Sequence, residues 1–244
     1  MRIKLGLFVL SLVLLTPLSS WAGPFNQFSS LIQAQALKPF ALDIGGVLGG
    51  AEFDPTPPTG FPGASVQLVG VMQTTPNSND IVLKDNGVKE FGLPMLQATV
   101  GLPFHLDVVA HGFSYDGATV LGGGLRYGLF TPSRILLFLP TIELSAMGDV
   151  INDSAFSMTH LSADASAIWR LPIIQPFLGV GFDDTKATID SAQLVGLNGL
   201  SATATGSRLT AGVDFTAIPF VTLRAAYMVF HGISGGELTA GVGF

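Results

Sequence analysis

The chain contains no cysteine among its 244 residues. That absence excludes disulfide frameworks, thiolate metal sites and cysteine nucleophiles. Charge is also scarce, because only 11% of the residues are Asp, Glu, Lys or Arg, where about 25% is usual for soluble domains. A soluble protein with so few charged side chains would struggle to cover its surface. The sequence has no run of Lys or Arg, which argues against a nucleic-acid partner.

Long apolar runs are missing after residue 22, and no segment there reaches the ~20 residues of a membrane helix. Residues 1–22 have the features of a signal peptide. Arg2 and Lys4 precede an apolar stretch over 5–15, and a small-x-small motif ends at Ala22. We expect export with cleavage after Ala22, and a retained membrane anchor is the alternative.

Instead of long apolar runs, the sequence has apolar residues at every second position, with polar residues or glycine between them. A strand places successive side chains on opposite faces, so this alternation predicts strands with one apolar face and one polar or glycine-rich face. It is clearest over the last 38 residues, where the apolar positions are Leu209, Ala211, Val213, Phe215, then Val221, Leu223, Ala225, Tyr227, Val229, then Leu238, Ala240, Val242 and Phe244.

The chain ends on Phe244, with Leu238, Ala240 and Val242 at alternate positions before it. This ending resembles that of bacterial outer-membrane β-barrel proteins of the porin-like kind, whose last strand closes on an aromatic residue. The resemblance implies that these four residues form an assembly signal, read by the outer-membrane barrel assembly machinery. It also implies a location in the bacterial outer membrane, where outer-membrane lipids surround the protein.

The alternation recurs along the rest of the chain. We predict an all-β protein in which residues 40–244 form a closed antiparallel transmembrane β-barrel of about twelve strands, with ten as the alternative. Bacterial single-chain barrels have an even number of strands, and the short segment 79–85 is included for that reason. The predicted strands lie near 40–50, 63–74, 79–85, 91–101, 104–115, 117–130, 135–148, 154–170, 174–189, 206–218, 220–230 and 235–244.

Connections and aromatic residues predict the orientation. Outer-membrane barrels have short periplasmic turns and longer outer loops. Short connections that contain proline lie at 101–104, 131–134, 171–174 and 217–220, and longer ones at 51–62, 86–90, 148–154 and 185–205. Placing Phe244 at the periplasmic end puts the short connections on that side. Aromatic residues expected at that membrane boundary are Tyr127, Trp169, Phe177 and Phe244.

Residues 23–39 have a different pattern. Phe25, Phe28 and Ile32 recur at three- and four-residue steps, and Pro39 follows. This spacing predicts a short amphipathic helix over 25–37. We expect the helix either to plug the barrel lumen or to cap its periplasmic base.

The face opposite the apolar one predicts the lumen. An Arg or Lys that faced lipid at the midplane would cost about 2–4 kcal/mol, so charged residues of the strands should point inward. Both signs of charge occur there, which fits either a water-filled, weakly selective channel or an internal network of ion pairs. Pairing among Arg208, Asp214, Arg224 and Glu237 is expected across neighbouring strands. The predicted lumen-lining residues are Asp43, Asp107, His111, Arg126, Glu143, His160, Asp164, Arg170, Arg208, Asp214, Arg224 and Glu237.

Catalytic and metal-binding patterns are weak. Two tetrapeptides, 111–114 and 231–234, begin with His-Gly and end with Ser, but positions i and i+3 of a strand face opposite ways. We assign no catalytic residue, no metal site and no cofactor. The predicted function is a non-enzymatic small channel or transporter for solutes of modest size. Hydrophobic solutes are one option. A structural envelope barrel and a lipid-modifying enzyme are the alternatives.

Overall fold

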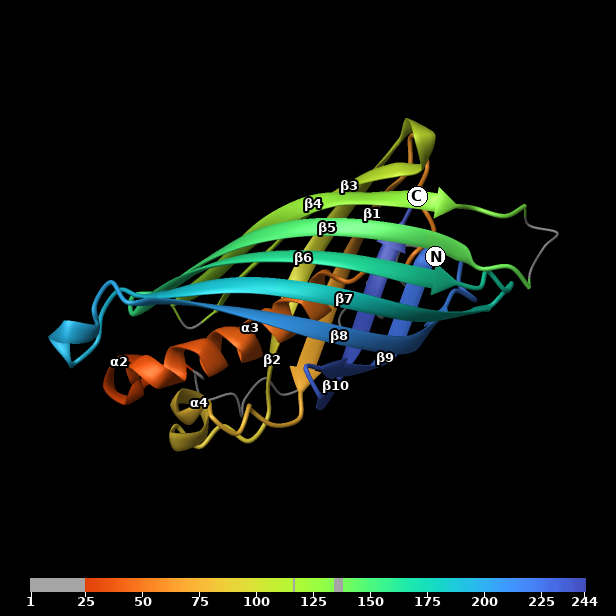
Figure 1. Ribbon diagram of the computed structural model, residues 1–244. Helices are drawn as coiled ribbons and strands as arrows, with labels where there is room; N and C mark the ends of the chain where they lie inside the picture. Colours follow the sequence, from red (N-terminus) through yellow and green to blue (C-terminus); the bar gives the residue numbers. More distant parts are fainter. Residues whose placement is uncertain (1–24, 116, 134–137) are drawn as a thin grey trace, which may run out of the picture.

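The computed structural model describes residues 25–115, 117–133 and 138–244, so the predicted signal peptide lies outside the described residues. Ten strands form the wall and run antiparallel to their neighbours (Figure 1). They are β1 Ala64–Gln73, β2 Phe91–Leu102, β3 Leu106–Tyr115, β4 Ala118–Phe130, β5 Thr141–Asn152, β6 Phe156–Ile168, β7 Ile174–Ile189, β8 Ser201–Phe215, β9 Val221–Phe230 and β10 Ile233–Gly243.

Each strand pairs with the next along the chain, and β1 pairs with β10 to close the barrel. The closing register runs without interruption from Ser65 opposite Gly243 to Gln73 opposite Gly235. The prediction of a closed antiparallel barrel is therefore confirmed. The alternative count of ten strands is correct, and the primary count of twelve is wrong.

Two segments that were predicted as strands are helical. Residues 40–50 belong to the helix α3 Leu37–Glu52, and 79–85 contains the helix α4 Ile81–Asp85. Glycines at every few positions of 40–50 satisfy both a two-residue and a helical spacing, so alternation there was ambiguous. In α4, the Asp80 side chain caps the helix by accepting a 3.1 Å hydrogen bond from the Leu83 backbone nitrogen.

The two ends of the barrel differ. We call the end where β10 stops the C-terminal mouth; the connections β2–β3, β4–β5, β6–β7 and β8–β9 also lie there. The opposite end is the N-terminal mouth. Its connections are long between β1 and β2 and between β7 and β8, but short at the other three hairpins. The expected contrast between short turns and long loops therefore holds only in part, since 148–154 falls mostly within β5.

The helix α3 lies inside the barrel and not beside it. It packs against β1, β2, β6, β7, β8 and β9, which surround it, and its residues 43–52 are all buried. Figure 1 shows it running along the barrel interior from the small helix α2 Phe28–Leu31. Pro39 was expected to end a helix over 25–37. It lies instead in the first turn of α3, where its missing N–H costs no hydrogen bond.

After α3 the chain continues through the lumen to the C-terminal mouth. Arg126 on β4 bonds to Asp54, and the Thr59 backbone nitrogen donates to Asp107 Oδ1 at 3.2 Å. The chain then turns into β1, where the Gly101 nitrogen donates to Gly63 O at 2.9 Å. The segment 51–62 was predicted as an outer loop, but its residues 51–55 are buried inside the barrel and the rest reaches the C-terminal mouth, where Phe61 is exposed. We call residues 37–56 the lumen segment.

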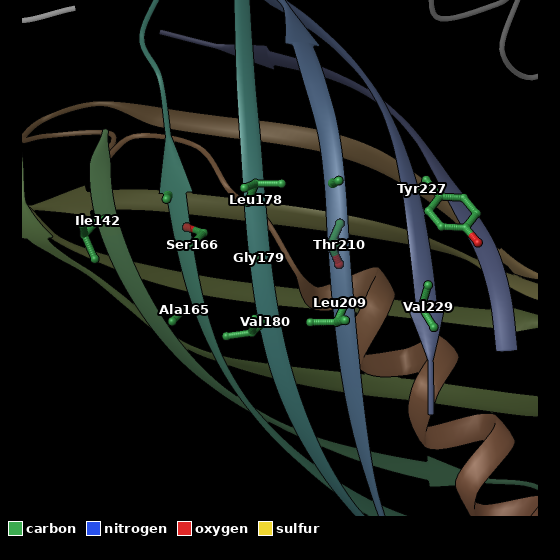
Figure 2. Close-up of a pocket in the computed structure, with 12 residues that line it drawn as sticks. Ile142, Ala165, Ser166, Leu178, Gly179, Val180, Leu209, Thr210, Tyr227 and Val229 are labelled. Carbon is green, nitrogen blue, oxygen red and sulfur yellow. The ribbon is translucent and has the colours of Figure 1, made fainter. Parts of the chain in front are cut away.

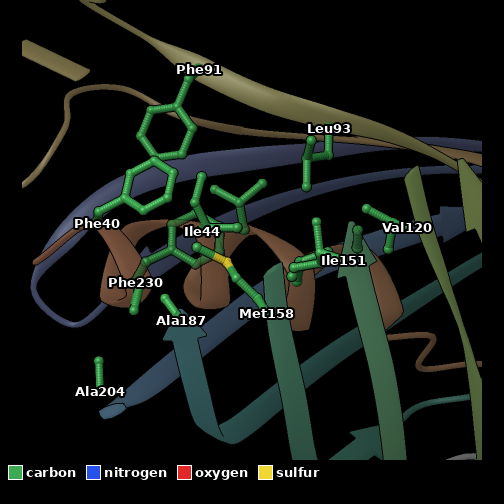
Figure 3. Packing of buried hydrophobic residues seen from close by; sticks show 14 of the residues in the cluster. Phe40, Ile44, Phe91, Leu93, Val120, Ile151, Met158, Ala187, Ala204 and Phe230 are labelled. Atoms are coloured by element: carbon green, nitrogen blue, oxygen red, sulfur yellow. The ribbon is translucent and has the colours of Figure 1, made fainter. Parts of the chain in front are cut away.

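The lumen has an apolar half near the N-terminal mouth. The ring centroids of Phe28 and Phe40 lie 4.8 Å and 5.2 Å from that of Phe156 on β6. Figure 3 shows side chains from β2, β4, β5, β6 and β9 converging on α3 around Ile44, including Met158 and Phe230. These contacts place the first half of α3 in a packed hydrophobic core.

The exterior of the wall is apolar. Among charged residues of the described strands, only Asp184 and Lys186 on β7 are exposed. Among the helices of the described residues, none has both the length and the apolar character to cross a membrane. Exposed aromatic side chains gather near the C-terminal mouth: Phe104, Tyr127, Phe130, Phe138, Phe215, Phe220 and Phe244. Phe177 was expected among them, but it is buried in the lumen and packs near Phe53.

Candidate functional site

The end of the lumen segment carries a carboxylate that joins two arginines of the wall. Arg126 Nη1 donates to the backbone oxygen of Asp54 at 2.9 Å and also to its Oδ2. Arg224 Nη2 donates to Asp54 Oδ1 at 2.9 Å. A third wall residue, Gln97, donates to Oδ2 at 3.3 Å. Asp54 therefore connects β2, β4 and β9 from inside the barrel.

Each arginine is also held by carboxylates of the wall itself. Arg126 Nη2 donates to Asp107 Oδ2 at 2.7 Å. Arg224 Nε donates to Asp214 Oδ1 at 2.6 Å, and Nη1 lies 3.4 Å from Glu237 Oε1. The Arg224 guanidinium carbon also lies 5.4 Å from the Phe177 ring centroid, a cation–π distance. All these side chains are buried, so the charge of each buried guanidinium is balanced by carboxylates of the protein itself.

A second cluster lies deeper, where α3 passes β6, β7 and β8. Arg208 Nη1 donates to Asp183 Oδ1 at 2.7 Å, and Nη2 donates to Asp164 Oδ1. Arg208 was expected to pair within the set that contains Arg224. It bonds instead to Asp183 on β7 and Asp164 on β6, because its side chain extends along the inner face of the barrel toward those strands.

Beside Arg208, the lumen segment contributes a second carboxylate, Glu52. Ser162 Oγ donates to Glu52 Oε2 at 2.5 Å, and His160 Nε2 lies 3.6 Å from Oε1. His160 Nδ1 is 2.8 Å from the Thr185 hydroxyl. Close by, His111 Nε2 lies 2.5 Å from Asp149 Oδ1. Two histidines from separate strands thus converge on neighbouring carboxylates.

A third cluster lies at the N-terminal mouth around Asp43 of α3. Asp43 Oδ1 accepts from Gln73 Nε2 at 2.9 Å and lies 3.2 Å from His231 Nε2. Its Oδ2 accepts from the Asn77 backbone nitrogen at 2.7 Å. Burial raises the pKa of nearby Asp80 to about 8, and repulsion from the Asp43 carboxyl contributes to the shift.

Glycines allow α3 to fit so closely between these groups. A Cβ added at Gly49 would lie 2.0 Å from both Arg208 Nη1 and Asp183 Oδ1. One at Gly45 would lie 2.0 Å from the Thr185 hydroxyl. On the adjacent face, a Cβ added at Gly50 would lie 2.8 Å from the Phe230 ring. Each glycine costs about 1 kcal/mol of helix propensity relative to alanine, and close packing against the wall offsets that cost.

The sequence-predicted residues fall into three groups. Eleven of the twelve predicted lumen residues are buried: Asp43, Asp107, His111, Arg126, Glu143, His160, Asp164, Arg208, Asp214, Arg224 and Glu237. Asp43 lies on α3 and not on a strand. Arg170 is the exception, because β6 ends at Ile168 and its guanidinium bonds to the Pro132 oxygen near the C-terminal mouth. Phe28 and Ile32 are buried, and Phe25 is half-buried.

Four central residues were missed from the sequence. Glu52 and Asp54 fell at the edge of a supposed outer loop, and Asp149 fell in another. Asp183 was passed over beside Asp184, although strand alternation sends one of the two inward. The alternation of inward and outward side chains along a strand could have identified Asp149 and Asp183 as lumen residues. Glu52 and Asp54 could be found only by knowing that the chain returns through the lumen.

The two His-Gly-x-Ser tetrapeptides do not form serine–histidine pairs. The Ser114 hydroxyl lies 3.0 Å from that of Thr119, and the Ser234 hydroxyl lies 2.7 Å from that of Tyr227. A His-x-Ser pattern does occur on one face of β6, at His160 and Ser162, and it was overlooked in the sequence. The serine donates to Glu52, His160 Nδ1 bonds to the Thr185 hydroxyl and His160 Nε2 has no hydrogen-bond partner, so the two side chains do not bond to each other.

The exterior wall has a shallow apolar hollow of about 570 Å³. Figure 2 shows its labelled residues on strands β5 to β9, with Leu178, Val180 and Leu209 along its middle and Tyr227 at one side. These four side chains are exposed. The hollow therefore faces away from the lumen and is separate from the ion clusters.

Comparison with known proteins gives structural likeness only. No protein-family model matches the sequence, and no curated protein matches it. An outer membrane channel from Pseudomonas putida F1 is similar with a TM-score of 0.48 and 10% identity, over 79% of this chain and 100% of that chain.

Two further solved structures are similar. The N-terminal β-barrel domain of Pseudomonas aeruginosa OprF has a TM-score of 0.39 and 13% identity, over 75% of this chain and 97% of that one. Neisserial surface protein A has a TM-score of 0.31 and 17% identity, over 74% and 95%.

Proposed function

We propose that the protein is a gated outer-membrane channel or transporter for small solutes, closed in this conformation by its own lumen segment. One observation carries the proposal. The second half of the lumen segment is held to the wall through Glu52 and Asp54, which bond to ionised or polar wall residues. Water can replace such contacts when the segment moves, and a hydrated path lined by charges of both signs then remains.

The size of the barrel supports this mechanism. Eight strands enclose just enough space for side chains, and this wall of ten strands also encloses a helix. A helix with its side chains is about 10 Å across. Withdrawal of α3 would leave a passage of that order, which suits solutes of modest size. No solute is specified by the side chains.

The proposed location is the bacterial outer membrane, reached after signal-peptide cleavage. The apolar exterior supports contact with outer-membrane lipids, and the aromatic residues near the C-terminal mouth fit a membrane boundary. We place that mouth in the periplasm, where Leu238, Ala240, Val242 and Phe244 would serve the barrel assembly machinery. The solvent-exposed Asp184 and Lys186 fit the part of β7 nearest the outer surface.

A structural barrel without transport is the second candidate. The specific observation in its favour is the packed apolar half of the lumen, where Phe28, Phe40 and Phe156 lock α3 at the N-terminal mouth. Such packing is costly to open. The two candidates predict opposite results when the lumen segment is released or fixed.

A disulfide lock tests the proposal, because the chain has no cysteine of its own. A Cβ at Gly45 would lie 3.0 Å from the Thr185 Cβ, so the pair Gly45→Cys and Thr185→Cys needs a shift of about 0.5 Å to reach disulfide geometry. The control pair is Ser114→Cys with Thr119→Cys, which staples two wall strands that already face each other.

Single-channel conductance in planar bilayers is the measurement. We expect openings in the wild type and in the reduced lock, no openings in the oxidised lock, and openings in the control pair under both conditions. Folding of each sample is checked by a heat-dependent shift in gel mobility. If folded wild type and folded reduced lock are both silent, the channel proposal is wrong and the structural barrel takes its place.

A further inference from the structure

Among the buried side-chain atoms that have no hydrogen-bond partner in the described residues, three are ligand-type atoms of neighbouring side chains. They are Glu52 Oε1, Asp149 Oδ2 and His160 Nε2. These three side chains can bring one ligand atom each to within 4.8 Å of one another. An unpaired buried carboxylate oxygen costs free energy that native structures rarely leave uncompensated. Two carboxylates this close need either a shared proton or a cation between them.

A proton shared by the two carboxylates would leave His160 Nε2 unpaired, whereas a cation would bind all three atoms. The other oxygens of both carboxylates are already occupied, since Glu52 Oε2 accepts from Ser162 and Asp149 Oδ1 lies 2.5 Å from His111 Nε2. The His160 ring is fixed from its far side by the Thr185 hydroxyl at 2.8 Å from Nδ1. That arrangement leaves Nε2 free toward the carboxylates, as in metal sites whose ligating histidines are oriented through the opposite nitrogen.

We propose that Glu52, Asp149 and His160 form a binding site for a divalent transition-metal ion, with Zn²⁺ the best fit. Imidazole nitrogen and carboxylate oxygen are zinc ligands at about 2.0–2.2 Å, and three protein ligands with a fourth, open position occur in catalytic zinc sites. His111 would hold Asp149 in place without binding the metal.

The site joins three elements. Glu52 comes from the lumen segment, Asp149 from β5 and His160 from β6. A bound ion would therefore tie the lumen segment to the wall at a second point, beside the Arg208 cluster. The proposal does not depend on transport, because it requires only the folded conformation.

Zinc content after refolding tests the proposal. The mature protein is refolded in detergent with Zn²⁺, washed with a weak chelator, and its metal is counted by mass spectrometry. We expect about one Zn²⁺ per chain, as for a single three-ligand site. Glu52→Gln and His160→Gln should each weaken binding by more than about 100-fold. His105→Gln is the matched control, because His105 is exposed at the C-terminal mouth.

Folding is verified in each variant by heat-dependent gel mobility, and two ligand variants guard against the failure of one. A folded wild type that retains no zinc would overturn the proposal and leave a shared proton between the carboxylates. Equal zinc in the wild type and in folded Glu52→Gln would overturn it as well, because the metal would then sit elsewhere. Both outcomes are independent of conductance.

Discussion

Arg224 on β9 and Asp54 at the end of the lumen segment are joined by a 2.9 Å hydrogen bond between Nη2 and Oδ1, 170 residues apart in sequence. The same aspartate receives Arg126 from β4. One carboxylate thus stands between two guanidinium groups that would otherwise face each other in the lumen. The interior of the barrel is organised by the segment that fills it.

Replacing that carboxylate should loosen the structure. We expect Asp54→Asn to lower the free energy of unfolding by about 3 kcal/mol, because removing one partner of a buried ion pair leaves the other uncompensated. Urea unfolding in detergent, followed by tryptophan fluorescence, measures the change. Asp190→Asn, at an exposed position between β7 and β8, should have almost no effect. Equal destabilisation by the two variants would contradict the assigned role of Asp54.

The fit of α3 depends on the absence of a side chain at Gly49. Gly49→Ala should destabilise the protein by about 1–3 kcal/mol, because the new methyl group would overlap Arg208 and Asp183. Alanine raises helix propensity by about 1 kcal/mol, so any loss must come from the clash. Gly196→Ala is the control, since nothing lies within 4 Å of a Cβ there. Unchanged or increased stability of Gly49→Ala would show that the helix is not seated as described.

The raised pKa of Asp80 predicts how stability depends on pH. In the unfolded chain an aspartate ionises near pH 4, at its ordinary pKa of about 3.9, whereas burial raises the folded pKa to about 8. Between these values the folded state holds one proton more, so this group makes stability fall as pH rises, and the fall stops above pH 8. Asp80→Asn should remove that decline while keeping the cap on Leu83.

The measurement is the free energy of unfolding of the wild type and of Asp80→Asn between pH 5 and pH 9, in steps of about one pH unit. This range lies above the unfolded pKa and spans the folded one. Asp85→Asn in the same helix is the matched control, because Asp85 is exposed. If the wild type and Asp80→Asn keep parallel curves over the whole range, Asp80 is not protonated in the folded state.

A specific role of Phe244 in assembly can be distinguished from a general requirement for exposed aromatic residues at the C-terminal mouth. Phe244 and Phe220 are both exposed at the C-terminal mouth. If Phe244 is part of an assembly signal, Phe244→Ala should reduce the amount of folded barrel in cell membranes several-fold, and Phe220→Ala should not. Refolding of both purified variants in detergent should be normal, since the Phe244 backbone bonds to Ala64 do not involve its ring. Equal membrane levels would remove the signal interpretation.

Alternation predicted the wall well because a strand that separates lipid from lumen must change polarity at each residue. It failed where the chain left the wall. In α3 every residue from 43 to 52 is buried, so no exposed polar side marks a helix, and Gly45, Gly46, Gly49 and Gly50 fit either period. The contacts of Glu52 and Asp54 could not be predicted, because they depend on a return path through the barrel that no local pattern encodes.

The passage of residues 37–56 through the lumen also constrains the order of assembly. Phe25 lies near Phe156 at one mouth, and Phe244 pairs with Ala64 at the other. The ring closes only when β10 reaches β1, which requires the whole chain. Either the wall strands assemble around a helix that is already in position, or the N-terminal segment enters the lumen after the barrel has closed. In the first case the wall strands assemble around α3, and a segment that precedes every wall strand in the chain is enclosed by the pairing of the first strand with the last.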